Sequence, residues 1–218
     1  MHTYNPLPSD HAVSPQAWYQ QALQQGLKAD VSQAAAIKQL ESLFQALCVF
    51  KQKRQRLWGK WLFSPEVPRG LYLYGGVGRG KSLLMDAFYA GLPFVRKRRL
   101  HFHHFMQEIH QALHDNKHEA DPLKKVAQDI AKTCRVLCFD EFHVSDIADA
   151  MILYRLLQTL FARGVVLVMT SNYAPDTLYP NGLHRDRFLP AIALIKAELS
   201  VLNVDSGQDY RHRSLHSA

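Results

Sequence analysis

The sequence predicts an α/β fold in which a five-stranded parallel sheet is covered by helices on both faces. Two observations carry this prediction. From residue 71 onward, short apolar runs alternate with segments whose apolar residues recur at helical spacing. The first apolar run ends in a cluster of glycines, and a later one ends in two acids. Strands that alternate with helices are typical of parallel sheets, because parallel neighbours need a crossover connection.

Five apolar or aromatic runs have the composition of buried strands, at residues 71–74, 100–105, 135–139, 165–169 and 198–204. Helical spacing between them predicts helices over residues 82–89, 106–113, 123–130, 147–161 and 187–196. Gly164 follows the fourth of these and is expected to end it.

The N-terminal part differs from the rest. Residues 32–50 form an amphipathic helical pattern, and residues 63–70 contain two prolines and a glycine, which indicates a loop. We therefore expect an N-terminal arm with helices over residues 1–62, a core domain over residues 63–205 and a polar tail over residues 206–218. Within the first segment, residues 1–14 are expected to be a loose arm.

The composition narrows the class of protein to which the chain can belong. The chain has 218 residues, of which 47% are apolar and 21% charged, as in ordinary globular proteins. No apolar run reaches the roughly 18 residues of a membrane span. The N-terminus has neither the pattern of a secretory signal nor an arginine-rich transit peptide. The three cysteines cannot all pair and show no CxxC spacing. We expect reduced thiols and a cytoplasmic protein.

The net charge of +7 favours acidic partners such as nucleotide, nucleic acid or anionic lipid. The excess gathers between residues 51 and 60 and between residues 96 and 99. Neither run has the regularly spaced aromatic residues of a single-strand binder. Positive faces around an anionic ligand are therefore favoured over a nucleic-acid groove, which stays open as an alternative, as does an anionic membrane surface.

A glycine-rich turn between the first strand and its helix fits GxxxxGK[ST] at every required position. Glycines let backbone N–H groups curl around phosphates, and the helix that follows adds a partial positive charge. The pattern predicts a P-loop that binds ATP. The phosphate-binding residues are expected to be Gly75, Gly76, Val77, Gly78, Arg79, Gly80, Lys81, Ser82 and Leu83, with Lys81 on the β- and γ-phosphates and Ser82 on Mg²⁺.

The third strand ends at Asp140 and Glu141. Asp140 is expected to hold Mg²⁺ with Ser82, and Glu141 to orient and deprotonate the attacking water. This pair favours an ATP hydrolase. Small-molecule kinases need no water-activating acid here. GTPases carry Asn-Lys-x-Asp after a later strand, whereas the similar residues 116–119 precede the third strand and lack the Asp.

Two further side chains are candidates for catalysis. Asn172 follows the fourth strand, which is expected to lie between the strands of the P-loop and of Asp140, where a polar side chain can hold the lytic water or the γ-phosphate. Its alternative is a turn-forming residue. Arg185, favoured over Arg187, precedes a helix where an arginine of a ring-forming ATPase completes a neighbouring subunit's site. Its alternative is a surface salt bridge.

Twelve histidines raise the question of a metal site, above all His101, His103 and His104. His101 and His103 would share one face of the predicted strand. No nearby Cys or carboxylate completes a ligand set, so a half-buried strand or a coupling element near the phosphates is favoured.

The combined motifs resemble the ZapE family of AAA+ ATPases, a family tied to bacterial cell division that has mitochondrial relatives. The resemblance runs over residues 15–211 and is carried by residues 70–86, 101–106, 137–151, 170–172 and 182–190. It implies an AAA+ fold of the additional-strand (ASCE) type and action at the division ring on the tubulin-like division protein. It also implies a homo-oligomer, and it places Asp30 and Gln33 near the adenine.

Members of that family continue into a helical lid over the nucleotide, for which the residues after Val204 are too few. The sequence is then either part of a longer protein or a short form, and weaker nucleotide binding and slow turnover are expected. Three functions stay open: an ATP-driven remodeller in division, a nucleic-acid-associated protein of the helicase-loader kind, and a nucleotide-binding remnant without turnover.

Overall fold

The computed structural model describes residues 13–27, 31–56, 65–77 and 80–205. Within them the elements follow in the order α1 (Pro15–Gln24), α2 (Val31–Arg56), β1 (Gly70–Tyr74), α3 (Lys81–Gly91), β2 (Lys97–His101), α4 (Phe102–Asp115), α5 (Pro122–Thr133), β3 (Val136–Asp140), α6 (Ile147–Ala162), β4 (Val166–Ser171), a short 3-10 turn η1 (Pro175–Thr177), α7 (Arg185–Glu198) and β5 (Leu199–Asn203).

The five strands form one sheet in the order β2-β3-β4-β1-β5, and every neighbouring pair is parallel. This confirms the predicted parallel sheet and places β4 between β1 and β3. Because the strands are parallel, their carboxyl ends share one edge, which is where ligands bind in such sheets. Tyr74, Asp140 and Ser171 end β1, β3 and β4 at this edge.

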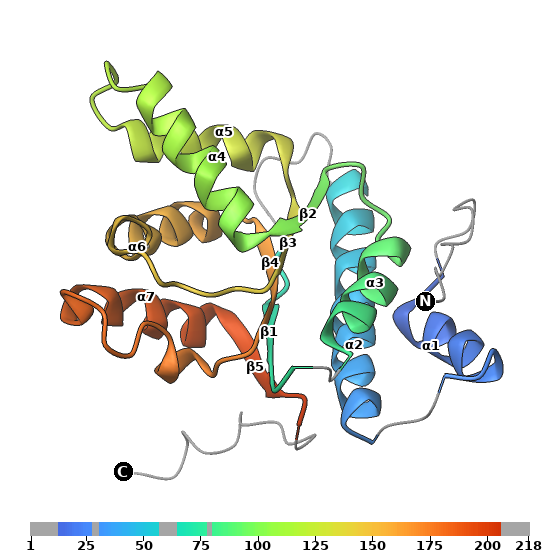
Figure 1. Ribbon diagram of the computed structural model, residues 1–218. Helices are drawn as coiled ribbons and strands as arrows, with labels where there is room; N and C mark the ends of the chain where they lie inside the picture. The colour runs from blue at the N-terminus through green and yellow to red at the C-terminus, as the bar shows by residue number, and fades with distance from the viewer. Residues whose placement is uncertain (1–12, 28–30, 57–64, 78–79, 206–218) are drawn as a thin grey trace, which may run out of the picture.

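Helices cover both faces of the sheet (Figure 1): α1, α2 and α3 lie on one side, and α5, α6 and α7 lie on the other with α4. Alternate side chains of each strand enter opposite cores. Leu71 and Leu73 of β1 pack among residues of α1–α3, whereas Tyr72 of the same strand packs with residues of α4–α7. The two apolar layers hold the strand ends in fixed positions.

The second strand differs from its prediction. β2 spans Lys97–His101, and Phe102 already begins α4, so the expected strand over residues 100–105 was wrong over residues 102–105. Alternation of Phe and His resembled a strand, but the buried residues of α4 are Phe102, Phe105, Met106 and Ile109, which is helical spacing. His101 and His103 therefore do not share a strand face.

The other elements lie close to their predicted bounds. β1, β3, β4 and β5 match within two residues, α2 extends the helix predicted at residues 32–50 to Arg56, and α7 begins at Arg185 rather than at residue 187. Gly164 has a φ of +72° just after α6, a conformation that ends a helix at little cost for glycine. The proposed domain limits near residues 62 and 206 and the tail lie outside the described residues.

No helix in the described residues combines the length and the apolar character that crossing a bilayer requires.

Candidate nucleotide site

The predicted phosphate loop connects β1 to α3 at the carboxyl edge of the sheet. Its first residue is fixed by a hydrogen bond from Gly75 N to Ser171 O on β4, at 3.2 Å. Gly80 has a φ of +73°, which glycine adopts freely, and no side chain of the described residues caps the helix that follows it. The first turn of α3 carries no acidic side chain, so its positive end suits an anion. Gly78 and Arg79 lie outside the described residues.

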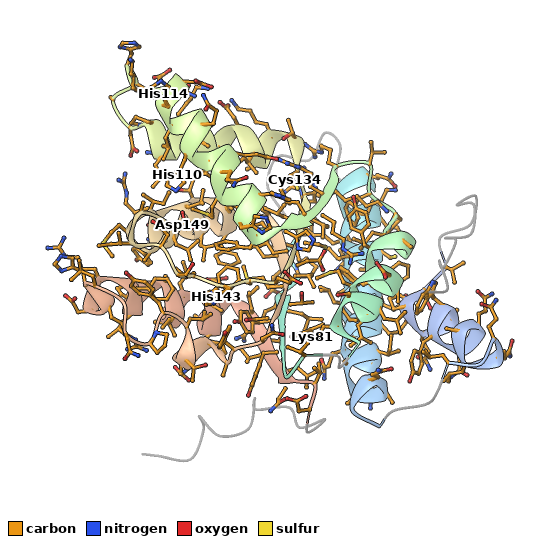
Figure 2. The ribbon with its side chains drawn as sticks, viewed as in Figure 1. Lys81, His110, His114, Cys134, His143 and Asp149 are labelled. Carbon is orange, nitrogen blue, oxygen red and sulfur yellow. The ribbon has the colours of Figure 1, made fainter. Side chains whose placement is uncertain are left out.

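Lys81 begins α3 beside this loop (Figure 2). Its ammonium group donates to the carbonyl oxygens of Gly75 and Gly76, at 2.7 Å each. Burial lowers the pKa of Lys81, while the charges of Asp205 and Glu141 oppose that shift. The ammonium thus lies within the curve of the loop, where a phosphate oxygen would gain a charge-assisted hydrogen bond.

Neighbouring side chains leave little room for a Cβ at Gly75 and Gly80. A Cβ built on Gly75 would lie 2.7 Å from Cγ2 of Val204, at the end of β5. A Cβ on Gly80 would lie 2.6 Å from Nε2 of Gln33, so Gln33, predicted near the adenine, packs against the loop from α2. Asp30, predicted beside it, lies outside the described residues. Asp205 also accepts a hydrogen bond from Gly76 N at 2.8 Å.

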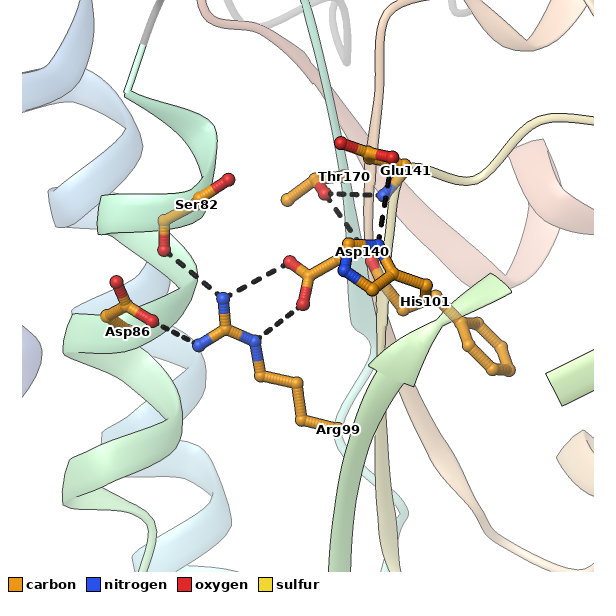
Figure 3. Close-up of polar contacts among 8 residues, drawn as sticks. Ser82, Asp86, Arg99, His101, Asp140, Glu141 and Thr170 are labelled. Carbon is orange, nitrogen blue, oxygen red and sulfur yellow. Dashed lines mark hydrogen bonds and ion pairs between the residues drawn. The ribbon is translucent and has the colours of Figure 1, made fainter. Parts of the chain in front are cut away.

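Asp140 faces Ser82 across the guanidinium of Arg99 (Figure 3). Arg99 Nε donates to Asp140 Oδ2 at 2.7 Å and Nη2 donates to Oδ1 at 3.3 Å. Nη2 also lies 3.4 Å from the carbonyl oxygen of Ser82, and Nη1 donates to Asp86 one turn further along α3. A single guanidinium therefore spans the gap between the P-loop helix and the acid of β3, which brings Ser82 and Asp140 close together.

Glu141 follows Asp140 in a left-handed conformation, with a φ of 55° that is uncommon for a residue other than glycine. Thr170 of β4 holds this turn, because its hydroxyl accepts from Glu141 N at 3.2 Å and its carbonyl accepts from Phe142 N at 2.7 Å. The Glu141 side chain is 72% exposed, and its Oε2 lies 3.7 Å from His101 Nδ1. The carboxylate is thus directed away from the core at the sheet edge, where it can meet water.

The structure does not connect the two remaining catalytic candidates to these groups. Asn172 is exposed just after β4, and Arg185 is partly buried and donates to the carbonyl oxygen of Asp176 at 2.9 Å. In the described part of the chain, neither makes a hydrogen bond to Lys81, Asp140 or Glu141. Their roles stay predictions.

The oxygen donors of Ser82 and Asp140 fit Mg²⁺, which prefers hydroxyl, carboxylate and water oxygens. The histidines are a poorer set of metal ligands than Ser82 and Asp140. The rings of His103 and His104 lie 3.9 Å apart, with His101 about 6 Å away. Across the described residues, no three His, Cys, Asp or Glu side chains come together as a metal-binding group.

The basic run of residues 96–99 is largely bonded to its own chain. Its partners are the carbonyl of Lys132 for Arg96, the carbonyls of Tyr89 and Leu92 for Lys97, the carboxylate of Glu108 for Arg98 and those of Asp86 and Asp140 for Arg99. Donors that are used within the protein are not free for a phosphate backbone. These bonds favour the interpretation that residues 96–99 stabilise the fold rather than form a nucleic-acid groove.

Comparison with known proteins decides the family. The model of the AFG1-like ATPase family matches residues 13–218. The chain belongs to the AFG1-like ATPase family. Among similar proteins of this kind, cell division protein ZapE of Escherichia coli K12 is 48% identical over 219 residues, which cover 95% of this chain and 58% of that protein. Lactation elevated protein 1 homolog B of Danio rerio is 44% identical over 166 residues, which cover 71% of this chain and 33% of that protein.

The family resemblance inferred from the motifs is thereby confirmed. The chain spans less than two thirds of the length of these relatives.

Solved structures confirm the fold. A crystal structure of DnaI aligns with a TM-score of 0.55 and 18% identity, covering 83% of this chain and 89% of that one. DnaA of Aquifex aeolicus, solved with AMPPCP, also gives 0.55, at 13% identity, covering 83% of this chain and 49% of that one. At such identities the likeness concerns the fold alone, which is that of P-loop AAA+ proteins.

Five residues at the site were not expected from sequence: Asp86, Arg99, Thr170, Ser171 and Asp205. The signal for Arg99 in the sequence was its place in the basic run of residues 96–99; its position on a strand that pairs with the strand of Asp140 came from the structure. Ser171 shows how a hydroxyl at a strand end can be structural, since its Oγ donates to Phe142 O at 2.7 Å.

Proposed function

We propose that this chain binds ATP with Mg²⁺ and hydrolyses it. The observation that carries the proposal is the meeting of Ser82, at the start of the P-loop helix, with Asp140, at the end of β3, across one guanidinium. Family membership supports the same activity.

In this proposal the loop from Gly75 to Leu83 encloses the phosphates, and Lys81 exchanges its bonds to loop carbonyls for bonds to phosphate oxygens. Ser82 and Asp140 would hold Mg²⁺. When bound, the metal neutralises charge that develops on the phosphates. Glu141 orients a water molecule and accepts its proton, for which its exposed position at the strand end is suited.

Asn172 is proposed to hold the attacking water or the γ-phosphate, and Arg185 to complete the site of a second copy of the chain. Arg185 would first have to leave the carbonyl of Asp176. Removing a charged donor from a transition state is expected to lower turnover by about 100-fold.

The test is phosphate release and nucleotide binding measured on the same samples. Lys81→Ala is expected to weaken binding of a fluorescent ATP analogue by about tenfold or more, since it removes a charge-assisted bond. Glu141→Gln is expected to bind the analogue normally and to release phosphate about 100-fold more slowly.

Matched controls are Lys117→Ala and Glu119→Gln on the connection between α4 and α5, which should behave as the native chain. Normal binding by Lys81→Ala would contradict the proposed site. Binding without any phosphate release by the native chain would instead favour the nucleotide-binding remnant.

We further propose a role in cell division, which rests on the 48% identity with cell division protein ZapE. The partner would be the tubulin-like division protein, with ATP controlling the contact. Sedimentation of that protein's filaments with the native chain and with Glu141→Gln tests this, and co-sedimentation independent of nucleotide would contradict it. Strong, salt-sensitive DNA binding would favour the helicase-loader alternative instead.

A further inference from the structure

Arg99 has a position to which the sequence motifs assign no role. Its side chain extends from the edge strand β2 across the carboxyl end of β3, and it is 21% exposed. In the register of the sheet Arg99 pairs with Cys138, so Arg99 and Asp140 lie on the same face, the one that faces α3. The guanidinium fork binds both oxygens of Asp140, the geometry in which arginine binds carboxylates most strongly (Figure 3).

The groups that Arg99 contacts include both residues expected to hold the metal. It binds the Asp140 carboxylate and lies against the Ser82 carbonyl. A guanidinium and a divalent cation that share one carboxylate repel each other, and each reduces the negative charge available to the other. Arg99 thus provides at Asp140 the positive charge that a metal would otherwise provide.

Asp86 gives Arg99 a second anchor. It lies one turn beyond Ser82 on α3, is half exposed, and accepts from Nη1 on the side of the guanidinium away from Asp140. A small rotation of the arginine about this anchor could free Asp140 while the charge of Arg99 stays paired. Such an exchange avoids leaving a buried charge without a partner.

We propose that Arg99 is an internal counter-cation that competes with Mg²⁺ for Asp140 and sets the Mg²⁺ concentration at which nucleotide binds. Arg99 is a positioning residue in this scheme: it holds Asp140 when no divalent cation is bound, and it shifts toward Asp86 when one binds. The inference rests on the proposed nucleotide site.

The experiment is a Mg²⁺ titration of a fluorescent ADP analogue bound to the native chain and to three variants. ADP is used so that the readout does not depend on hydrolysis. Arg99→Gln is expected to lower the half-saturating Mg²⁺ concentration by about tenfold, because it removes a charge-assisted competitor. Arg99→Lys keeps the positive charge but cannot bind both oxygens of Asp140 at once, so the half-saturating Mg²⁺ concentration is expected to fall by about threefold.

Arg98→Gln is the matched control. Arg98 is the preceding residue of β2, but its side chain pairs with Glu108 of α4, so its removal should leave the Mg²⁺ midpoint unchanged. Thermal unfolding gives a second readout. In EDTA, Arg99→Gln should melt at a lower temperature than the native chain, and its melting temperature should rise more when Mg²⁺ and ADP are added.

An Arg99→Gln midpoint equal to or above the native value would overturn the inference, since it would mean that the arginine assists the metal or is indifferent to it. If Arg99→Gln does not fold, the same criterion applies to Arg99→Lys: a Mg²⁺ midpoint equal to or above the native value overturns the inference. Failure of the native chain to bind the ADP analogue at any Mg²⁺ concentration would refute the proposed nucleotide site itself, a distinguishable result.

Discussion

Thr170→Val tests whether the hydroxyl of β4 holds the turn that carries Glu141. Valine has nearly the shape of threonine, and Thr170 is 2% exposed, so the main change is loss of the oxygen. The amide of Glu141, which donates to Thr170 Oγ1 at 3.2 Å, then loses this acceptor. The left-handed φ of Glu141 depends on such local bonds, because the conformation is intrinsically unfavourable.

The expected loss of stability is about 1–2 kcal/mol, the usual cost of one partly buried amide that loses its partner. For a domain of this size that corresponds to a decrease in melting temperature of roughly 2–8 °C. Glu141 should also sample positions away from the attacking water, so kcat should fall by about tenfold while nucleotide affinity stays unchanged, since neither Lys81 nor Ser82 is touched.

Urea unfolding, phosphate release and fluorescent-nucleotide binding measure the three quantities. Thr177→Val is the control, because Thr177 is exposed on η1 and, among the described residues, its hydroxyl bonds only the local carbonyl of Ala174. If Thr170→Val matched this control in both stability and kcat, the hydroxyl would not be what positions Glu141.

Three further predictions concern other parts of the molecule. Gly70→Ala should destabilise the chain in urea by about 3 kcal/mol, because the added Cβ would lie 1.9 Å from the carbonyl oxygen of Leu167, and an unchanged midpoint would contradict the close packing of β1 on β4. Asp205→Asn keeps an acceptor for the P-loop amide but removes a negative charge, so nucleotide titrations should show about two- to fivefold tighter binding, and weaker binding would argue against this reasoning. Burial raises the pKa of the Cys138 thiol, so it stays protonated at pH 8, and iodoacetamide followed by mass mapping should modify the partly exposed Cys48 first.

The sequence was most informative where the pattern is local. The glycine-rich turn, the apolar strand ending at Asp140 and the alternation of strands with helices each fall within a few residues, and the parallel sheet confirms the arrangement they predicted. The strand over residues 100–105 failed for a local reason as well. Leu100 and Phe102 alternate with His101 and His103 as in a strand, whereas Phe102 and Phe105 are three residues apart, which is a helical spacing, and both are buried in the core formed with α4–α7.

The rest depended on register between distant segments. The pair of Arg99 with Asp140 joins residues 41 apart, and the bond of Thr170 to Glu141 joins residues 29 apart. Each follows from which residues lie side by side in neighbouring parallel strands, which hydrophobic periodicity does not specify to one residue. These polar contacts at the strand ends could therefore be identified only from the three-dimensional structure.

The charged character of β2 has a consequence for how copies of the chain can meet. β2 is an edge strand of the sheet, and three of its five residues are Lys97, Arg98 and Arg99. Unpaired strand edges invite another strand to dock, and positively charged side chains along an edge discourage it through repulsion between like edges. A sheet continued from one molecule to the next through two β2 edges is therefore disfavoured, whereas β5, the other edge strand, carries no such charge.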